Sequence, residues 1–348
     1  MTKARRIALA AVAVCVGLVG MEAYRLVDSP PSKSAAEIVE ERGYAGQMEL
    51  QREILAYWRK HDREAETRTP FYFVRVANLF KQFAVTHSGS LKDLSIVEIG
   101  PGSSMIPGAL FISAGAKHFY AVDIYEHPAI RDALPYRTAF DLAKLDPDYF
   151  ARNANEIILK EQGGKATLNP AYISFVKRES FDTGLPDASI DFLFSMVTLE
   201  HLNDPLQSIA EWKRVLKPGG ISAHIAIQAD HRDLSKPYEY LKLDPAAWRA
   251  QFGPGREPLH HYVNQWRPID FRRAFEQQGF EILEYSTEIP GAYAREQGRV
   301  LYPTRTMTDA DWQQIVPSVR EGKTREEVSQ LFITIVVRKP ANSPRKSR

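Results

Sequence analysis

The chain has 348 residues, of which 44% are hydrophobic and 25% charged, an ordinary globular composition that excludes extensive disorder and a fold with many membrane spans. Lysine and arginine total 45 against 43 acidic residues, and a net charge of +2 gives no reason to expect nucleic acid as a partner. The single cysteine, Cys15, excludes an intrachain disulfide and a cysteine-based zinc site.

The amino-terminal segment predicts a membrane anchor. After MTKARR, residues 7–21 carry no charge, and as a helix they would extend about 22 Å, which the next few residues lengthen to a marginal membrane span. A cleaved secretory signal is the alternative, although no clear cleavage site follows. We therefore expect residues 1–28 to be a single-pass membrane anchor or a signal, with the membrane as a partner.

The next segments predict helices and then an alternation of strands and helices. Residues 29–90 are expected to form a linker and amino-terminal helices, because apolar side chains recur at helical spacing in residues 71–83. After Leu94, short apolar runs alternate with helical segments, which predicts parallel βαβ units and an α/β, doubly wound, mostly parallel sheet. The seven expected strands are residues 95–99, 118–124, 171–179, 190–196, 220–228, 280–286 and 331–339. We expect one domain over residues 91–338 and a disordered basic tail at 339–348.

The first expected strand runs directly into a glycine-rich turn. Its sequence, SIVEIGPGSS, places Glu98 in the strand and Gly100 and Gly102 in the turn, where glycines allow the backbone to approach a ligand closely. A phosphate-binding P-loop would need Lys-Ser/Thr after the second glycine, and a dinucleotide fingerprint would need a third glycine at Met105. Neither is present, so nicotinamide and flavin cofactors are disfavoured.

An acidic residue follows at the end of the second strand. Asp123 lies 23 residues after Gly100, and an acid about 20 residues after such a turn can accept hydrogen bonds from both hydroxyls of a ribose. A solvated strand-end carboxylate is the alternative interpretation.

These motifs resemble those of the class I S-adenosylmethionine-dependent methyltransferases, particularly the type 11 branch. The resemblance implies a Rossmann-like seven-stranded sheet and S-adenosyl-L-methionine as the cofactor. Ser103 stands where the family usually has a third glycine. By this resemblance, the methionyl end of the cofactor would lie against Glu98, Gly100, Gly102 and Ser103, the ribose against Asp123, and the adenine against Ile124.

The resemblance continues through the run RESFDTGLPDASIDFLFSMVTLEHLNDP. It implies that Phe181 and Asp182 lie beside the adenine, with Asp182 accepting a hydrogen bond from its amino group. Ser195 and Met196 would end the fourth strand facing the cofactor. Residues 216–220, LKPGG, are similar to the family's turn into its fifth strand.

Methyl transfer from a sulfonium needs alignment above all, and a general base is required only when the acceptor must lose a proton. Candidate bases near the carboxyl ends of the strands are Glu200, His201, His231 and Asp233, of which we favour His231, Asp233 and His201 as catalytic residues. Bracing of the loop after the fourth strand is the alternative for His201. His224 lies within the fifth strand and is expected to be a core residue.

Residues 230–265 are rich in aromatic residues and histidine and form an insert beyond the basic fold, which suggests a substrate lid; ordinary aromatic packing is the alternative. A metal site built from His231, Asp233, His260 and His261 has no diagnostic spacing, so we expect no metal.

The resulting hypothesis is a methyltransferase enzyme that acts on a small or lipid-linked acceptor. A loose similarity to methyltransferases found with glycan-building enzymes favours a glycan hydroxyl. Because S-adenosylmethionine is made in the cytosol, we expect the catalytic domain to face the cytoplasm, although Lys3, Arg5 and Arg6 favour the opposite topology. An exported, non-enzymatic binding protein with the same fold is the alternative, and no nucleic-acid partner is expected.

Overall fold

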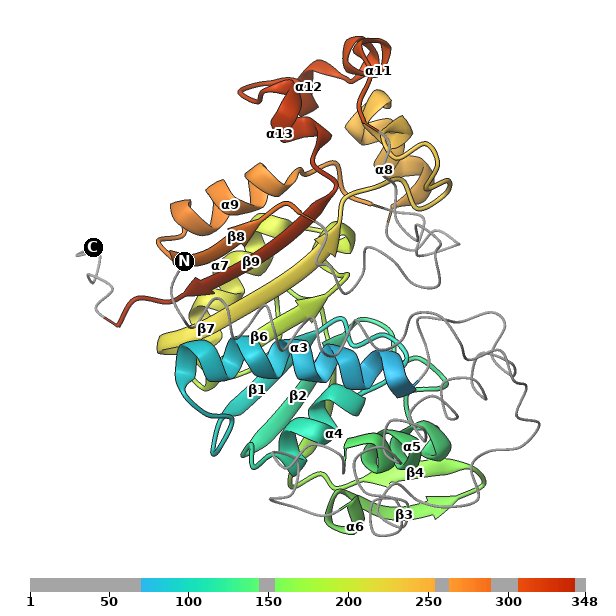
Figure 1. Ribbon diagram of the computed structural model, residues 1–348, viewed down its shortest axis with the longest axis vertical. Helices are drawn as coiled ribbons and strands as arrows, with labels where there is room; N and C mark the ends of the chain where they lie inside the picture. The colour runs from blue at the N-terminus through green and yellow to red at the C-terminus, as the bar shows by residue number, and fades with distance from the viewer. Residues whose placement is uncertain (1–69, 144–153, 254–262, 289–305, 342–348) are drawn as a thin grey trace, which may run out of the picture. The chain divides into compact units, whose positions relative to one another are not determined.

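The fold is built on one seven-stranded sheet, seen in a computed structural model of the chain (Figure 1). The structure describes residues 70–143, 154–253, 263–288 and 306–341. The strands lie in the order β5-β2-β1-β6-β7-β9-β8, and a separate two-stranded sheet pairs β3 with β4. The strands are β1 (Ser95–Ile99), β2 (His118–Asp123), β3 (Ile158–Gln162), β4 (Lys165–Leu168), β5 (Ile173–Lys177), β6 (Ile190–Met196), β7 (Leu216–Ile227), β8 (Glu281–Ser286) and β9 (Phe332–Arg338).

Helices connect these strands. They are α3 (Pro70–Ser88), α4 (Ile106–Ser113), α5 (Ala133–Ala143), α6 (Ala154–Ile157), α7 (Pro205–Val215), α8 (Pro245–Phe252), α9 (Pro268–Gln277), α11 (Asp309–Gln314), α12 (Pro317–Arg320) and α13 (Arg325–Ser329), with 3-10 turns η2 (Leu199–His201) and η3 (Glu239–Lys242).

The predicted α/β class is confirmed. The pairs β1/β2, β1/β6 and β2/β5 are parallel, whereas β8 and β9 are antiparallel to each other. All seven expected strands are found in this sheet, and the helical spacing at 71–83 corresponds to α3. The strands could be predicted because strands that are buried on both faces consist of continuous runs of β-branched and aromatic residues, which are easily recognised in a sequence.

The described residues form two compact units. The N-terminal unit comprises the described residues within 22–195 and 214–223, and the C-terminal unit those within 196–213 and 224–348. In the N-terminal unit, α3 crosses in front of β1 and β2 (Figure 1). Its Phe80 ring lies 4.5 Å from that of Phe194 in β6, and Phe111 of α4 meets the same ring at 5.5 Å. These aromatic contacts fix α3 and α4 on the sheet.

Close packing between α4 and β2 depends on one glycine. A Cβ atom added to Gly108 would lie 2.1 Å from Cδ1 of Phe119, whose ring is fully buried. Since a helical glycine is otherwise unfavourable, its presence here is explained by this approach of helix to strand.

We therefore expect Gly108→Ala to destabilise the protein by roughly 1–3 kcal/mol, because the overpacking exceeds the gain of about 1 kcal/mol in helix propensity. Chemical denaturation would measure it. The double variant Gly108→Ala/Phe119→Leu should lose less than the sum of its two single changes. An unchanged midpoint for Gly108→Ala would contradict this account of the packing.

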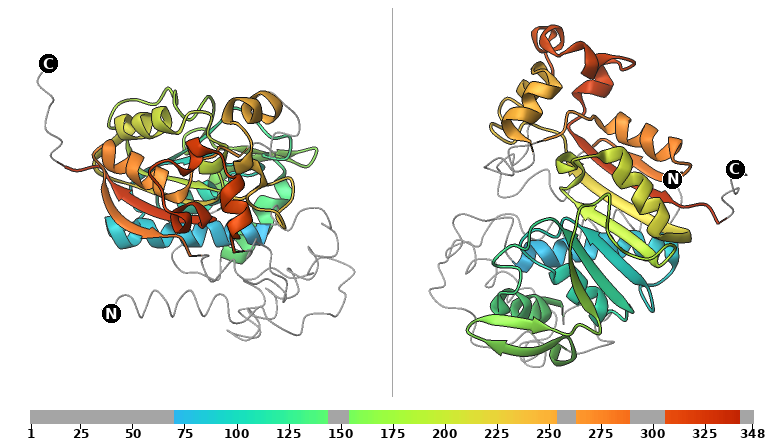
Figure 2. Two further views of the ribbon diagram at one scale, coloured as in Figure 1. Left: turned by 90° about the horizontal axis from the view of Figure 1, so that it is seen from above. Right: turned by 180° about the vertical axis from the view of Figure 1, so that it is seen from behind.

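The long connection between β2 and β5 contains structure that we did not predict. It holds α5, α6 and the β3–β4 hairpin, which lies beside α5 (Figure 2). The hairpin turns at Gly163 and Gly164, with φ values of +57° and +74°, as a tight two-residue turn requires. Lys165 Nζ contacts Asp132 Oδ1 at 2.5 Å and ties the hairpin to the start of α5.

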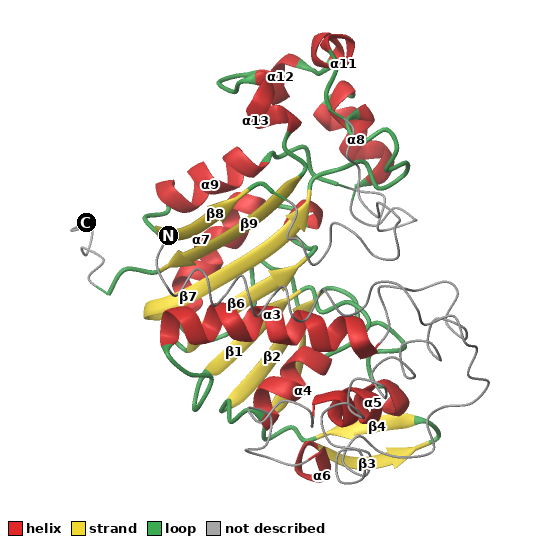
Figure 3. Cartoon of the chain, in the orientation of Figure 1, coloured by secondary structure: helices red, strands yellow, loops and turns green. Residues whose placement is uncertain are grey.

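In the C-terminal unit, α9 lies along β8 and β9 (Figure 3). His224 is fully buried there, as expected of a core residue, and its ring stacks between Trp212 at 4.6 Å and Phe275 at 5.5 Å. Burial lowers the pKa of His224 from 6.5 to about 3.

This burial predicts a defined pH dependence of stability. Below pH 6.5 the unfolded chain binds a proton at His224 that the folded chain excludes, so stability is lost as the pH falls from 6.5 towards 3, by up to about 1.4 kcal/mol per pH unit. His224→Phe should flatten that part of the profile, while the two profiles stay parallel above pH 7. Equal slopes below pH 6 in both proteins would exclude His224 as the cause.

The predicted membrane location is corrected. In residues 70–143, 154–253, 263–288 and 306–341, no helix is both long enough and apolar enough to cross a membrane. The segment on which the prediction rested, residues 1–28, lies outside the described residues, as do residues 29–69 of the expected linker and helices and the basic tail from residue 342 onward.

Candidate functional site

The glycine-rich turn after β1 has the backbone that the sequence predicts. Gly100 and Gly102 adopt φ values of +72° and +60°, a region that side chains with a Cβ atom rarely adopt. The Gly100 N–H donates to the Val122 carbonyl at 2.9 Å, which holds the turn beside the carboxyl end of β2. A Cβ atom at Gly102 would meet nothing within 4 Å, so this part of the turn faces open space. Ser103 is half-buried in the same turn.

Asp123 ends β2 next to this turn, as predicted. Its Oδ1 accepts from the Tyr125 N–H at 3.0 Å, and the N–H groups of Gly102 and Ile124 also donate to the carboxylate. Burial raises the pKa of Asp123, and these backbone hydrogen bonds act against that rise. Ile124 is 48% exposed, unusual for a large apolar residue, and is available to contact a ligand.

Glu98 supplies a second carboxyl group to the same region. It is only 3% exposed, and its Oε2 has no hydrogen-bond partner. Burial, with a contribution from Asp123, raises the pKa of Glu98 well above its usual value. In the described part of the chain, neither carboxyl forms an ion pair. A ligand that brings positive charge or hydroxyl donors would therefore stabilise both groups.

The amino end of α4 is less open than the sequence suggested. The Met105 N–H donates to the Tyr136 hydroxyl at 3.1 Å, and the Ile106 N–H to Ser104 Oγ at 3.1 Å. Tyr136 is buried and donates in turn to the Ile130 carbonyl at 2.8 Å. These donors are already used within the protein, so the turn is not a phosphate cradle. Tyr136 was not predicted from the sequence, because it belongs to the long connection after β2.

The residues expected around the adenine differ in their burial and in the partners that they already have. The Arg178 N–H donates to the Asp123 carbonyl at 3.1 Å, so the segment after β5 begins beside the cofactor candidates. Phe181 is half-buried, but Asp182 is exposed and pairs with Arg178 at 3.0 Å. Recognition of an adenine by Asp182 would thus compete with this ion pair. Ser195, fully buried, and Met196, half-buried, end β6.

The expected catalytic residues belong to the C-terminal unit, where two of the three come together. His201 ends η2, His231 follows β7, and their ring centroids lie 5.0 Å apart. The turn of η2 is held by Asn264, whose Nδ2 donates to the Leu199 carbonyl at 2.7 Å and whose N–H donates to the Glu200 carbonyl at 2.7 Å. Burial raises the pKa of Glu200 to about 8.

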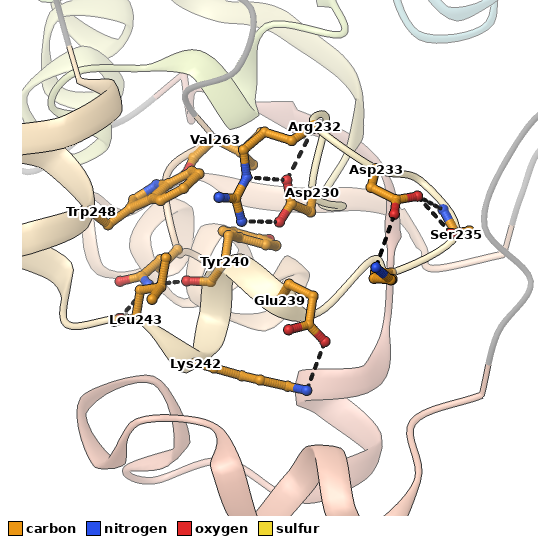
Figure 4. A network of polar contacts seen from close by, with 12 residues as sticks. Asp230, Arg232, Asp233, Ser235, Glu239, Tyr240, Lys242, Leu243, Trp248 and Val263 are labelled. Atoms are coloured by element: carbon orange, nitrogen blue, oxygen red, sulfur yellow. Dashed lines mark hydrogen bonds and ion pairs between the residues drawn. The ribbon is translucent and has the colours of Figure 1, made fainter.

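Asp233 does not join these histidines in a common group. It is exposed, and its Oδ1 accepts from the Ser235 hydroxyl at 2.6 Å and the Ser235 N–H at 3.0 Å, as Figure 4 shows. These hydrogen bonds lower the pKa of Asp233. A carboxylate with a lowered pKa that caps its own turn is a weak proton acceptor, so the geometry gives it a structural role.

The aromatic residues of the insert are largely part of a core. Tyr238, Tyr240 and Trp248 are each at most 2% exposed, within an apolar cluster that includes Leu331 and Phe332. Arg232 forms two hydrogen bonds to Asp230, of 2.9 and 2.6 Å, and its guanidinium lies 4.7 Å from the centre of the Trp248 ring (Figure 4). Tyr238, Tyr240 and Trp248 therefore pack as core residues, which is the alternative interpretation of the insert. Residues 254–262, with His260 and His261, lie outside the described residues.

Part of the chain is similar to known methyltransferases. Residues 138–223 match the model of a methyltransferase domain family. A probable S-adenosylmethionine-dependent methyltransferase of Mycolicibacterium smegmatis is 29% identical over 150 residues, which cover 40% of this chain and 51% of that protein. The chain therefore matches about half the length of this relative.

Two solved structures of methyltransferases show a weaker similarity. An S-adenosylmethionine-dependent methyltransferase from Mesorhizobium loti is 14% identical with a TM-score of 0.37, covering 72% of this chain and 92% of that one. A geranyl diphosphate C-methyltransferase from Streptomyces coelicolor is 15% identical with a TM-score of 0.39, covering 76% and 80%. Nothing about function rests on similarities of this size.

The match over residues 138–223 and the similarity to the curated relative support a methyltransferase domain that uses S-adenosyl-L-methionine as its cofactor. The family model covers β5 and β6 but neither Gly100 nor Asp123. The roles of those residues therefore rest on the geometry described above.

If Asp123 binds the ribose of S-adenosylmethionine, Asp123→Asn should weaken cofactor binding by about 10- to 150-fold, equivalent to roughly 1.5–3 kcal/mol, because charge-assisted hydrogen bonds become neutral ones. Isothermal titration calorimetry with the full chain would measure the loss. The matched control is Asp187→Asn, an exposed carboxylate of the same unit that pairs with Arg214. Equal affinities in the Asp123 variant and the wild type would refute the assignment.

Proposed function

We propose that this protein transfers the methyl group of S-adenosylmethionine to a hydroxyl of a small-molecule acceptor, with a saccharide as the first candidate. The observation that carries the proposal is a pair of carboxyl groups, the buried Glu98 and the half-buried Asp123, beside a glycine turn whose nearby N–H donors are already used. Among the described residues, neither carboxyl has an ion-pair partner. S-Adenosylmethionine carries a sulfonium and an ammonium and presents two ribose hydroxyls. These are the groups that such a pair of carboxyls would bind.

Within this proposal, each residue of the turn has a physical role. Glu98, Gly100, Gly102 and Ser103 would hold the methionyl end, and Asp123 would accept hydrogen bonds from the ribose. Ile124 offers exposed apolar surface for the adenine, and Phe181 a half-buried ring. Asp182 would have to exchange Arg178 for the adenine amino group, and Ser195 and Met196 would complete the site at the end of β6. Bound cofactor supplies an activated methyl group, so the protein has mainly to orient the acceptor.

A hydroxyl acceptor must also lose its proton, and we propose that the cluster of Glu200, His201 and His231 serves this step. The two histidines are half-buried, so they can be reached from solvent, and their rings lie 5.0 Å apart. Asp233, which we also predicted, is not part of this cluster.

The choice of a saccharide is supported by a cavity in the C-terminal unit. Its volume is about 540 Å³, within the usual range for small-molecule sites. The half-buried indole of Trp266 lines it beside amide and charged groups: Asn264, Gln265, Arg273 and Lys323. An apolar ring with convergent polar groups suits a hydroxyl-rich ligand that also has apolar faces. We accordingly propose residues 91–338 as the methyltransferase domain, with residues 230–265 contributing to acceptor binding.

The test is methyl transfer by the full chain from labelled S-adenosylmethionine to a panel of mono- and oligosaccharides, phenols, amines and carboxylic acids. We expect labelled product and an equal amount of S-adenosylhomocysteine with at least one hydroxyl acceptor, and loss of both in Asp123→Asn at low cofactor concentration. The Asp187→Asn control should behave as the wild type. Binding of the cofactor without transfer to any hydroxyl, but with transfer to an amine or carboxylate, would overturn the choice of acceptor.

A further inference from the structure

Three side chains that commonly bind metal ions come together in the C-terminal unit. Glu200 and His201 are neighbours in η2, and His231 comes from the loop after β7. Each offers one ligand atom, and these atoms all lie within 4.8 Å of one another. The histidine rings meet at 66°, edge to face, with centroids 5.0 Å apart. Residues separated by about thirty positions in the sequence are therefore brought to one point by the fold.

Glu200 is the unusual member of this group. It is fully buried, its Oε1 accepts from the Ile227 N–H at 3.2 Å, and its Oε2 has no hydrogen-bond partner. Among the described residues, no lysine or arginine forms a salt bridge with it. A buried carboxyl oxygen without a donor or cation is unfavourable, so each such group calls for an explanation. A cation bound at this oxygen would provide one.

The surrounding structure holds the ligands in place. Asn264 fixes the η2 turn through the Leu199 and Glu200 carbonyls, each at 2.7 Å. On the other side, the Asp230 N–H donates to the Pro237 carbonyl at 3.1 Å, and the Asp230 carboxylate binds Arg232, which together hold the backbone next to His231. Tetrahedral coordination at about 2.0–2.1 Å requires ligand atoms roughly 3.3 Å apart. The ligand atoms, within 4.8 Å of one another, would therefore have to move closer when the ion binds.

The ligand types indicate which ion would bind. Two imidazoles and one carboxylate are typical of zinc and other first-row divalent ions, whereas magnesium and calcium prefer oxygen ligands alone. Three protein ligands also leave at least one coordination position open for an oxygen donor from solvent or acceptor, as in catalytic rather than structural zinc sites.

We propose that Glu200, His201 and His231 form a binding site for one divalent transition metal ion, for which Zn²⁺ is the probe. This replaces our sequence-based expectation that the protein binds no metal. Metal binding itself does not depend on methyl transfer, although a role of the ion in acceptor activation would rest on the proposed function. A bound ion occupies the nitrogen lone pair that a histidine needs to accept a proton. The cluster would then activate a hydroxyl by coordination.

The test uses the full chain, treated with a chelator, desalted and dialysed against Zn²⁺, with metal content measured by mass spectrometry. We expect about one Zn²⁺ per chain, a rise in melting temperature on loading, and a visible absorption spectrum with Co²⁺ that shows nitrogen coordination. Mg²⁺ in excess should not displace Zn²⁺. His201→Ala and His231→Ala should each weaken Zn²⁺ binding at least tenfold and change the Co²⁺ spectrum.

Two controls make the result specific. His87→Ala changes a half-buried histidine on α3, and Asp233→Asn changes a carboxylate two residues from His231; both should retain wild-type Zn²⁺ affinity. Glu200→Gln should weaken binding as the histidine variants do, and if this buried change prevents folding, the two histidine variants decide. Failure to bind Zn²⁺, or Zn²⁺ binding unaffected by either histidine change, would overturn the site. Cofactor titration of the same samples reports separately on the proposed function.

Discussion

Desolvation of two neighbouring carboxyl groups is the constraint on which the cofactor assignment depends. Parallel pairing of β1 and β2 puts Ile99 opposite Val122, so the turn at Gly100 and the carboxylate of Asp123 emerge side by side. Glu98, in the buried part of β1, adds a second acid. Such a pair is tolerated where a ligand can compensate it, and less easily in a purely structural role. The positive charges and hydroxyls of S-adenosylmethionine match that requirement, whereas a dinucleotide pyrophosphate would add more negative charge.

The C-terminal unit meets a different constraint, because it buries a cation. Arg267 is fully buried, and its guanidinium donates to the Gln228 carbonyl at 2.9 Å, to the Tyr240 hydroxyl at 2.7 Å and to the Gln330 carbonyl. These partners come from the end of β7, from η3 and from the segment before β9. One side chain thus joins the insert to the strands and makes it part of a packed core. This explains why aromatic residues that are conspicuous in the sequence, such as Trp248, are used for packing.

Prediction from sequence succeeded where the candidate site residues lie within one short segment of regular local structure. The run from Ser95 to Ser104 contains a buried strand and a turn that requires positive φ, and the structure has both, followed by a helix that begins at Ile106. The position of Asp123 followed from the length of one βα unit. The β3–β4 hairpin was not predicted, although its Gly163-Gly164 pair is visible in the sequence. The membrane anchor was inferred from composition alone, and no described helix supports it.

The candidate catalytic residues show most clearly what could not be predicted from the sequence. Glu200, His201, His231 and Asp233 were selected because they lie near strand ends in the sequence. Their sequence positions did not show which of them lie close together in space. Only the tertiary structure brings the first three together, turns Asp233 toward Ser235 and leaves one Glu200 oxygen without a partner. The sequence by itself determined the α/β class, the order of the strands along the chain and the glycine turn, because these follow from local periodicity and backbone conformation. Which side chains share a site was decided by the tertiary structure, because contacts between distant segments depend on strand pairing and loop anchoring that no local pattern encodes.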